Sequence, residues 1–410
     1  MNSMRFASLQ IKIAKWVDEY FGRLLIALLR GLRFRGPAAL PLESPQKILL
    51  IKFWGMGSII LLEPALRLLR ERYPHARIEF LTLTQNRELF ALLQPIARVH
   101  TLDFARPLRF LLCAVQVCAQ LRRQNFDIIL DAEFFANFSA LLARLAAPRK
   151  LLGFSRAQGY KRHLLDAAIP FHDHEHAAQN FLRLVAAATN TPIPRFDQRV
   201  FPRVSLPQRA HIGENYVVVN VNASALALER RWPPQHFAQL AKWLLQRYES
   251  KLILIGDKAE RAYTQQIAEA IAAPMRVRNL AGTMHLRELA EVIDHAALFI
   301  SNDSGPLHLA AALQKPVVGF YGPETPQRFG PLCEQRLIFY LGLACSPCMS
   351  VDNAKSVHCT NHLRCMRELQ VAQVVPVLER FIAQHALLPL REMKNEETIL
   401  SPAGVFPYAD

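Results

Sequence analysis

The sequence has no apolar stretch long enough to cross a bilayer, which takes about 20 residues. The longest unbroken apolar run near the amino end, Leu24 to Leu29, is far shorter. No small-residue cleavage site follows it, so we do not expect a secretory signal peptide. The sequence also lacks the spacing of paired zinc-finger histidines and any strand with interleaved aromatic and basic residues. These two absences argue against a nucleic-acid partner.

Acidic residues are in deficit, and cysteine is scarce until late in the chain. The 34 Asp and Glu residues are outnumbered by 49 Lys and Arg, which gives a formal net charge of +15 and favours an anionic partner such as a phosphate-bearing substrate or an anionic lipid. The seven cysteines crowd toward the end, unlike a secreted disulfide framework. The chain of 410 residues, 51% of them hydrophobic, is long enough for two domains with large cores.

Residues 1–45 form a basic amino-terminal extension. Apolar side chains recur there at helical spacing: Ile13, Val17, Tyr20, Phe21, Leu24 and Leu28. A basic amphipathic helix of this kind is typical of a segment that lies on the anionic, cytoplasmic face of a membrane. A helix that packs against the protein's own body has the same pattern, and this alternative stays open.

From residue 46 onward, apolar strands alternate with helical stretches. The expected strands are 47–53, 77–82, 98–104 and 127–132 in the first half, and 216–221, 251–256, 298–301 and 317–321 in the second. Such alternation predicts parallel sheets covered by helices on both faces. Four prolines in 191–210 mark a linker between the halves, 46–190 and 211–385, with a tail at 386–410. Two Rossmann-like α/β domains facing a central cleft are therefore expected.

The stretch SNDSGPLHLAAALQKPVVGFYGP, residues 301–323, follows the apolar run AALFI at 296–300. Together they read as strand, tight turn, helix and strand, with the strands at 296–300 and 317–321. In such a unit the turn lies at the carboxyl end of the sheet, and the helix start offers unpaired N–H groups to an anion. Asp303, Ser304, Gly305 and His308 would surround that anion. The alternative interpretation has Ser304 as a helix cap, Asp303 as a favourable partner of the helix dipole, and His308 as a packing residue.

These motifs resemble glycosyltransferase family 9, which includes the ADP-heptose:lipopolysaccharide heptosyltransferases. The resemblance covers the run just quoted, ERRWPPQHFAQLAKWL, LILIGDKAERAYTQQIA, NLAGTMHLRELAEVI and, in the first half, LLIKFWGMGSIILLEPALRLLRERYPHARIEFLT. It implies the two-domain GT-B fold, with 46–190 as the acceptor-side domain and 211–385 as the donor-side domain, which binds the nucleotide sugar and includes the cysteine-rich loop 345–365. It also implies inverting, metal-independent transfer of a sugar from a nucleotide-sugar donor, ADP-heptose or similar, to a lipopolysaccharide-core or other lipid-linked acceptor. The implied location is the cytoplasm, peripheral on the inner membrane face.

The resemblance also assigns donor-binding residues. Asp303, Ser304, Gly305 and His308 would hold the diphosphate, and Arg230 stands where the family usually has a phosphate-contacting lysine. In the same way, Glu260 would accept hydrogen bonds from ribose hydroxyls and Thr283 would cap a helix facing the nucleotide. A solvated charge at Arg230, an exposed helix-start acid at Glu260 and a cap without ligand contact at Thr283 are the alternatives.

Four late cysteines form a second group: Cys345, Cys348, Cys359 and Cys365. The two-residue gap of the first pair suits a tetrahedral metal, so a structural zinc ion is one hypothesis, and reduced thiols packing a loop are the other. We assign these thiols no catalytic part and expect no cofactor to be required for catalysis.

One position departs from the family pattern. Where the family's first turn reads Met-Gly-Asp, with an aspartate placed to take the acceptor proton, this chain has Ser58, a very poor base. Glu133, just past the strand at 127–132, is the substitute base we predict, and an acceptor-binding or surface carboxylate is its alternative. Because of this departure, a degenerate sugar-nucleotide- or glycan-binding assembly partner stays open as a second function.

Overall fold

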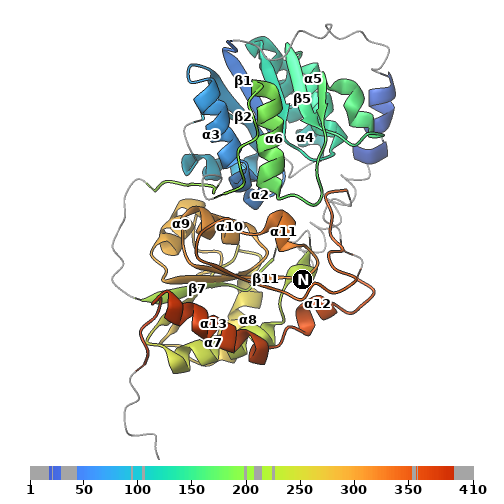
Figure 1. Ribbon diagram of the computed structural model, residues 1–410. Helices are drawn as coiled ribbons and strands as arrows, with labels where there is room; N and C mark the ends of the chain where they lie inside the picture. The colour runs from blue at the N-terminus through green and yellow to red at the C-terminus, as the bar shows by residue number, and fades with distance from the viewer. Residues whose placement is uncertain are drawn as a thin grey trace, which may run out of the picture.

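The computed structural model describes residues 18–20, 22–28, 44–93, 96–103, 107–197, 201–206, 215–223, 227–352, 357 and 359–391. They form two α/β domains, one above the other in Figure 1. Each contains one parallel sheet of six strands, in the orders β3-β2-β1-β4-β5-β6 and β12-β11-β10-β7-β8-β9. The prediction of two Rossmann-like domains is confirmed.

The first sheet consists of β1 (Lys47–Ile51), β2 (Arg77–Leu83), β3 (Arg98–Leu102), β4 (Ile128–Asp131), β5 (Lys150–Phe154) and β6 (Ala167–Ile169). Strands β5 and β6 were not among the strands predicted from the sequence. Helical elements connect the strands: α2 (Met56–Leu61), α3 (Glu63–Arg72), η1 (Thr84–Ala91), α4 (Pro107–Gln124), α5 (Asn137–Leu145), η2 (Tyr160–Leu164) and α6 (Ala177–Thr189). Apolar side chains of α4 and α5 cover one face of this sheet, and those of α2, α3 and α6 cover the other.

The second sheet consists of β7 (Tyr216–Asn220), β8 (Lys251–Leu254), β9 (Val277–Asn279), β10 (Leu298–Asn302), β11 (Val317–Tyr321) and β12 (Arg336–Tyr340). Its helical elements are η4 (Leu228–Arg230), α7 (Pro234–Arg247), α8 (Arg261–Ile271), α9 (Leu286–Asp294), α10 (Gly305–Ala312), α11 (Pro326–Phe329), α12 (Arg364–Arg367) and α13 (Val371–Gln384). The β10–α10–β11 unit is the strand–helix–strand unit predicted for residues 296–321.

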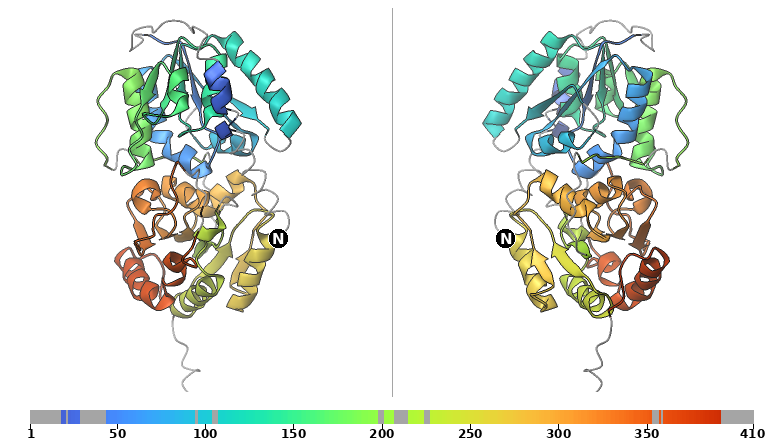
Figure 2. Two further views of the ribbon diagram at one scale, coloured as in Figure 1. Left: turned by 90° about the vertical axis from the view of Figure 1, so that its right-hand side faces the viewer. Right: turned by 90° about the vertical axis from the view of Figure 1, so that its left-hand side faces the viewer.

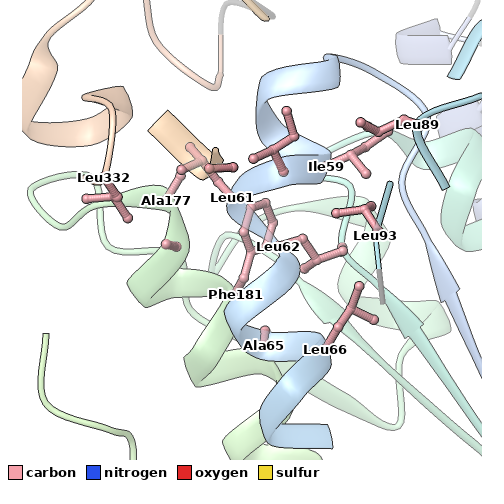
Figure 3. Close-up of a cluster of buried hydrophobic side chains, with 14 of the residues drawn as sticks. Ile59, Leu61, Leu62, Ala65, Leu66, Leu89, Leu93, Ala177, Phe181 and Leu332 are labelled. Carbon is pink, nitrogen blue, oxygen red and sulfur yellow. The ribbon is translucent and has the colours of Figure 1, made fainter. Parts of the chain in front are cut away.

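The two domains share apolar contacts. Figure 3 shows Ile59 and Leu61 of α2 and Phe181 of α6 in a buried group with Leu332, which follows α11 in the second domain. The same cluster continues into α10 through Leu307. This junction brings the first turn of the first domain against the β10–α10 turn of the second.

The amino-terminal extension is described at residues 18–20 and 22–28, which are helical, and this segment is called the N-terminal helix below. Ile26 is fully buried against α5 and η2. The Asp18 carboxylate accepts hydrogen bonds from the backbone N–H groups of Asn137 and Phe138 at the start of α5, at 3.0 and 2.6 Å. One face of the helix therefore packs on the protein's own body, whereas Tyr20, Leu24 and Leu28 stay exposed.

Within the described residues, no helix is long and apolar enough to span a membrane. The predicted linker at 191–210 is described except for 198–200 and 207–210. Its residues 201–206 lie against the first domain, where the backbone N–H of Arg203 donates to Glu63 at 2.9 Å. The predicted tail lies outside the described residues beyond position 391.

Candidate active site

The β10–α10 turn is built by buried hydrogen bonds. Ser304 caps α10, its side chain accepting from the backbone N–H of Leu307. Its hydroxyl is fixed in turn by the Asn220 amide at 3.0 Å and the Ser301 hydroxyl at 2.8 Å. The cap, which is the alternative interpretation of Ser304, is therefore confirmed, and a contact of Ser304 with a diphosphate stays a prediction. The cap leaves the N–H groups at the helix start directed toward the domain junction, an arrangement that favours an anion.

Arg230 and Asp303 form a buried ion pair beside this turn. The guanidinium Nη1 lies 3.1 Å from the Asp303 carboxylate, and both side chains are less than one-tenth exposed. The Arg230 Nε also donates to the backbone carbonyl of Ala227. The structure thus brings the predicted residues Arg230 and Asp303 together and fixes the orientation of the guanidinium.

Glu260 belongs to a second group of polar side chains, at the carboxyl ends of β7 and β8. Its carboxylate accepts from Arg231 at 3.3 Å and from the backbone N–H of Asp257 at 3.0 Å. Arg231 also stacks on the ring of Tyr263, 4.2 Å from its centroid. Burial raises the pKa of Glu260, against the effect of the Asp257 backbone N–H. Sequence reasoning missed Arg231 and Tyr263, although Arg231 directly follows a residue that it singled out.

Thr283 is not a helix cap. The N-cap of α9 is His285, which forms a reciprocal capping box with Glu288. The Thr283 hydroxyl donates instead to the backbone carbonyl of Leu280 at 2.8 Å. Gly282 adopts a left-handed conformation, at φ +73°, and the turn lies close to the Lys258 backbone. Helix α9 is therefore capped two residues after Thr283. The predicted cap is therefore corrected, and a contact of Thr283 with donor stays a prediction.

The glycine-rich turn of the first domain meets the β10–α10 turn directly. A Cβ on Gly57 would lie 2.4 Å from Cδ2 of His308, and a Cβ on Gly305 would lie 2.7 Å from Cε of Met56. Neither glycine could carry a side chain without movement, so the absence of Cβ allows this close approach. Ser58, next to Gly57 in α2, is also buried at this junction.

Glu133 lies at the end of β4 and holds the loop after β1. Its carboxylate pairs with the Lys52 ammonium at 2.9 Å and accepts the backbone N–H groups of Phe53 and Trp54 at 2.5 and 2.9 Å. Burial acts to raise the pKa of Glu133, but Lys52 and these N–H groups outweigh it and lower the pKa. A buried carboxylate with three donors and a lowered pKa is a weak base. This geometry favours a positioning role over proton abstraction.

Asp131 and Lys161 make a neighbouring buried pair at 2.8 Å. Ser139 donates to the same aspartate at 2.8 Å, and Lys161 also donates to the backbone carbonyl of Glu133. Asp131 is thus fully buried. Lys52 and Lys161 were missed, although a lysine at the end of an apolar strand such as KILLIK is a visible signal of a buried charge that needs a partner.

The four late cysteines are free thiols. Cys365 is buried, whereas Cys345, Cys348 and Cys359 are exposed. Burial, followed by the nearby Cys348, Cys359 and Cys345, raises the pKa of Cys365 to about 11. Across the described residues, no three side chains of His, Cys, Asp or Glu are gathered as a metal-binding set. As positioned, these thiols do not fit a zinc ion, and the structural zinc stays a prediction.

Comparison with known proteins agrees with this architecture. Residues 115–358 match the model of glycosyltransferase family 9 (heptosyltransferase). Lipooligosaccharide heptosyltransferase 2 of Haemophilus ducreyi is 28% identical over 72% of this chain and 89% of its own. Lipopolysaccharide heptosyltransferase 2 of Escherichia coli K12 is 26% identical over 76% of this chain and 93% of its own.

Solved structures share the fold. The E. coli ADP-heptose lipopolysaccharide heptosyltransferase II superposes with a TM-score of 0.65 at 21% identity, covering 83% of this chain and all of that one. An E. coli heptosyltransferase solved with ADP superposes with a TM-score of 0.64 at 19% sequence identity, and the match covers 82% of this chain and all of that one. The predicted GT-B fold is confirmed. Since the family model matches more than half of its residues, the chain belongs to glycosyltransferase family 9 and is a glycosyltransferase.

Proposed function

We propose that the protein transfers heptose or a related sugar from a nucleotide-sugar donor to a lipopolysaccharide-core or other lipid-linked acceptor. Family membership and the heptosyltransferase names of its relatives support this reaction. ADP-heptose is the donor class that we favour, because the similar structures include an ADP-heptose lipopolysaccharide heptosyltransferase and a heptosyltransferase with bound ADP.

The observation that carries the proposal is the buried β10–α10 turn facing the other domain. The start of α10, the Arg230 guanidinium and His308 supply positive potential and hydrogen-bond donors for a diphosphate. These groups neutralise the leaving nucleoside diphosphate without a metal ion in the proposed reaction. The acceptor oxygen attacks the anomeric carbon from the opposite face as the bond to the diphosphate breaks, which inverts the configuration, and its proton passes to a base.

We place the protein in the cytoplasm, peripheral on the inner face of the cytoplasmic membrane, where a lipid-linked acceptor would be available. Its formal charge of +15 and the exposed apolar side chains of the N-terminal helix support this placement.

The test is ADP release from ADP-heptose in the presence of heptose-deficient lipopolysaccharide, with and without EDTA. We expect turnover that survives EDTA and a product with inverted anomeric configuration by NMR. His308→Ala should weaken ADP-heptose binding, measured by calorimetry, by about 1.5–3 kcal/mol through loss of a charge-assisted hydrogen bond. Unchanged affinity in a folded His308→Ala protein would contradict the diphosphate site.

A binding module without transferase activity is the second candidate, and Ser58 in place of the family's aspartate is the observation that favours it. Tight binding of ADP-heptose with no turnover on any lipopolysaccharide acceptor would establish it. A strong rise in rate on Ser58→Asp would instead show that this position still faces the acceptor.

A further inference from the structure

Exposed apolar side chains gather on one side of the first domain. Within the described residues, nine of the fourteen exposed large apolar side chains come from the N-terminal helix, α4, α5 and η2: Tyr20, Leu24, Leu25, Leu28, Leu111, Leu112, Val115, Leu145 and Tyr160. Single exposed apolar residues are ordinary on a protein surface, but a concentration of this kind marks an interaction surface.

The elements that carry these side chains are neighbours. The Phe110 ring of α4 lies 5.0 Å from the Phe138 ring of α5, and Asp18 of the N-terminal helix accepts from the backbone N–H of the same Phe138. The N-terminal helix and α4 therefore flank α5 on one side of the first sheet. Figure 2 (left) shows this side, with the N-terminal helix in dark blue and α4 in cyan.

The α4 stripe is the most exposed part of this surface. Leu111, Leu112 and Val115 are 59%, 66% and 69% exposed. Their spacing of one and four residues places them on one face of the helix. The opposite face, with Val117 and Leu121, is buried against the sheet. Helix α4 is thus apolar on both faces, although only one of them has a partner in the described chain.

The charged residues of helix α4 itself all have one sign. Helix α4 contains Arg109, Arg122 and Arg123 and no acidic residue, and all three arginines are exposed. Long basic side chains at the rim of an apolar surface extend toward lipid phosphates while the apolar side chains enter the headgroup boundary. A protein partner with an apolar face would not by itself require this positive rim.

We propose that the exposed face of α4, together with Tyr20, Leu24 and Leu28 of the N-terminal helix, is the surface with which this protein docks on an anionic lipid bilayer. This surface deepens the peripheral placement within the proposed function. It orients the acceptor-side domain toward the membrane that would hold a lipid-linked acceptor. Docking does not depend on sugar transfer, so vesicle binding and turnover can fail separately.

The test is co-sedimentation of the full-length protein with vesicles of phosphatidylglycerol and phosphatidylcholine in equal parts, and with vesicles of phosphatidylcholine alone. The native protein should bind the anionic vesicles and bind the neutral ones weakly, with an affinity that falls as salt rises. The triple variant Leu111→Gln, Leu112→Gln and Val115→Gln should bind the anionic vesicles at least about tenfold less tightly, because its apolar contact with lipid is lost. Thermal unfolding and ADP-heptose binding should be unchanged.

Met275→Gln and Leu390→Gln are the matched controls, because these exposed apolar side chains lie in the second domain; both should bind vesicles like the native protein. If the triple variant unfolds, Arg122→Gln with Arg123→Gln should still lower the affinity and flatten its salt dependence. Native-like binding by the folded α4 variant would overturn the proposal, as would equal binding to neutral vesicles. A native dimer that becomes monomeric in the α4 variant would assign the surface to a second copy instead.

Discussion

Glu133 is the residue where local pattern and three-dimensional contacts favour different roles. Its place at the end of a strand predicts a catalytic carboxylate, but in the structure it accepts from Lys52 and from two backbone N–H groups. The sequence could not reveal these contacts, because Lys52 lies 81 residues away in the chain. Substituting one or both residues of the Lys52–Glu133 pair separates a base from a positioning residue.

Glu133→Gln should lower stability by about 3–5 kcal/mol, because it leaves the Lys52 ammonium buried without its anion. The double variant Lys52→Met, Glu133→Gln removes both charges and should recover part of that stability, measured by urea unfolding. If Glu133 positions the 53–54 loop, turnover should recover along with stability in the double variant. Turnover that stays abolished in both variants, with donor binding intact, would instead support a role as base.

His176 should make the stability of the protein depend on pH. Burial, and then the nearby charges of His308 and Arg336, lower its pKa to about 3, although its ring nitrogen Nε2 lies 2.9 Å from the Gly330 carbonyl. The other ring nitrogen accepts the Ala178 N–H, so the folded state holds this ring neutral. Between about pH 6.5 and 3, the unfolded chain binds a proton at His176 that the folded chain does not.

The stability that the neutral His176 ring contributes is therefore fully present above about pH 6.5, and it is lost as the pH falls toward 3. At pH 5 the loss from His176 should be about 2 kcal/mol. His176→Gln keeps a donor and an acceptor but does not titrate, so its free energy of unfolding should depend less on pH between 6.5 and 4. An identical pH profile for the two proteins, measured by denaturant unfolding, would show that the pKa of His176 is the same in the folded and unfolded states.

The N-terminal helix stabilises α5 by capping it from outside. The capping carboxylate belongs to Asp18, more than 100 positions before the helix that it caps. Asp18→Ala removes the acceptor for two N–H groups of α5 and should lower the free energy of unfolding by about 1–2 kcal/mol. Glu19→Ala is the matched control. It removes only an exposed pair with Arg23 at 2.8 Å, so its effect should stay below about 0.5 kcal/mol. Equal effects in the two variants would exclude the cap.

This packing changes what truncation would do. Deleting residues 1–45 would remove the Asp18 cap and expose the surfaces that bury Ile26, so a loss of membrane binding would be mixed with a loss of stability. Substituting the exposed Tyr20, Leu24 and Leu28 leaves both contacts in place. From the sequence, a helix that faces a membrane and a helix that packs on the protein's own body were alternatives. The described turns of this helix have both a buried apolar face and an exposed one.

The pattern of elements was predictable to the extent that side chains repeat with a regular period. Long apolar runs such as KILLI and YVVVN became β1 and β7 within a few residues of the expected bounds. The three-residue β6 was not predicted, because AAI is too short to show a period. Of the candidate site, the β10–α10 turn was predictable because its residues are contiguous. The Arg231–Tyr263 stack and the Lys52–Glu133 pair join residues distant in sequence.

How the two domains meet depends on one residue without a side chain. Gly57 of the acceptor-side domain lies against the ring of His308 of the donor-side domain, where an added Cβ would come within 2.4 Å of Cδ2. Further contacts hold the domains together around this point. Arg156 pairs with Asp352 of the second domain at 2.7 Å, and Glu88 accepts from the backbone N–H of Leu286 at 3.1 Å. A larger residue at position 57 therefore requires either the two turns or the His308 side chain to shift.

Gly57→Ala should separate the two turns, because the added Cβ would overlap the His308 ring. Because catalysis requires the donor and the acceptor to be held within reacting distance, we expect turnover to fall at least about tenfold. The radius of gyration from small-angle X-ray scattering should rise. ADP-heptose affinity should change less than turnover, since the residues proposed to bind the diphosphate belong to the donor-side domain. Ser58→Ala, at the neighbouring position, removes an atom rather than adding one and should leave the scattering unchanged. A Gly57→Ala protein with native turnover and native scattering would mean that His308 moves aside at little cost, and that the contact does not control how the domains close.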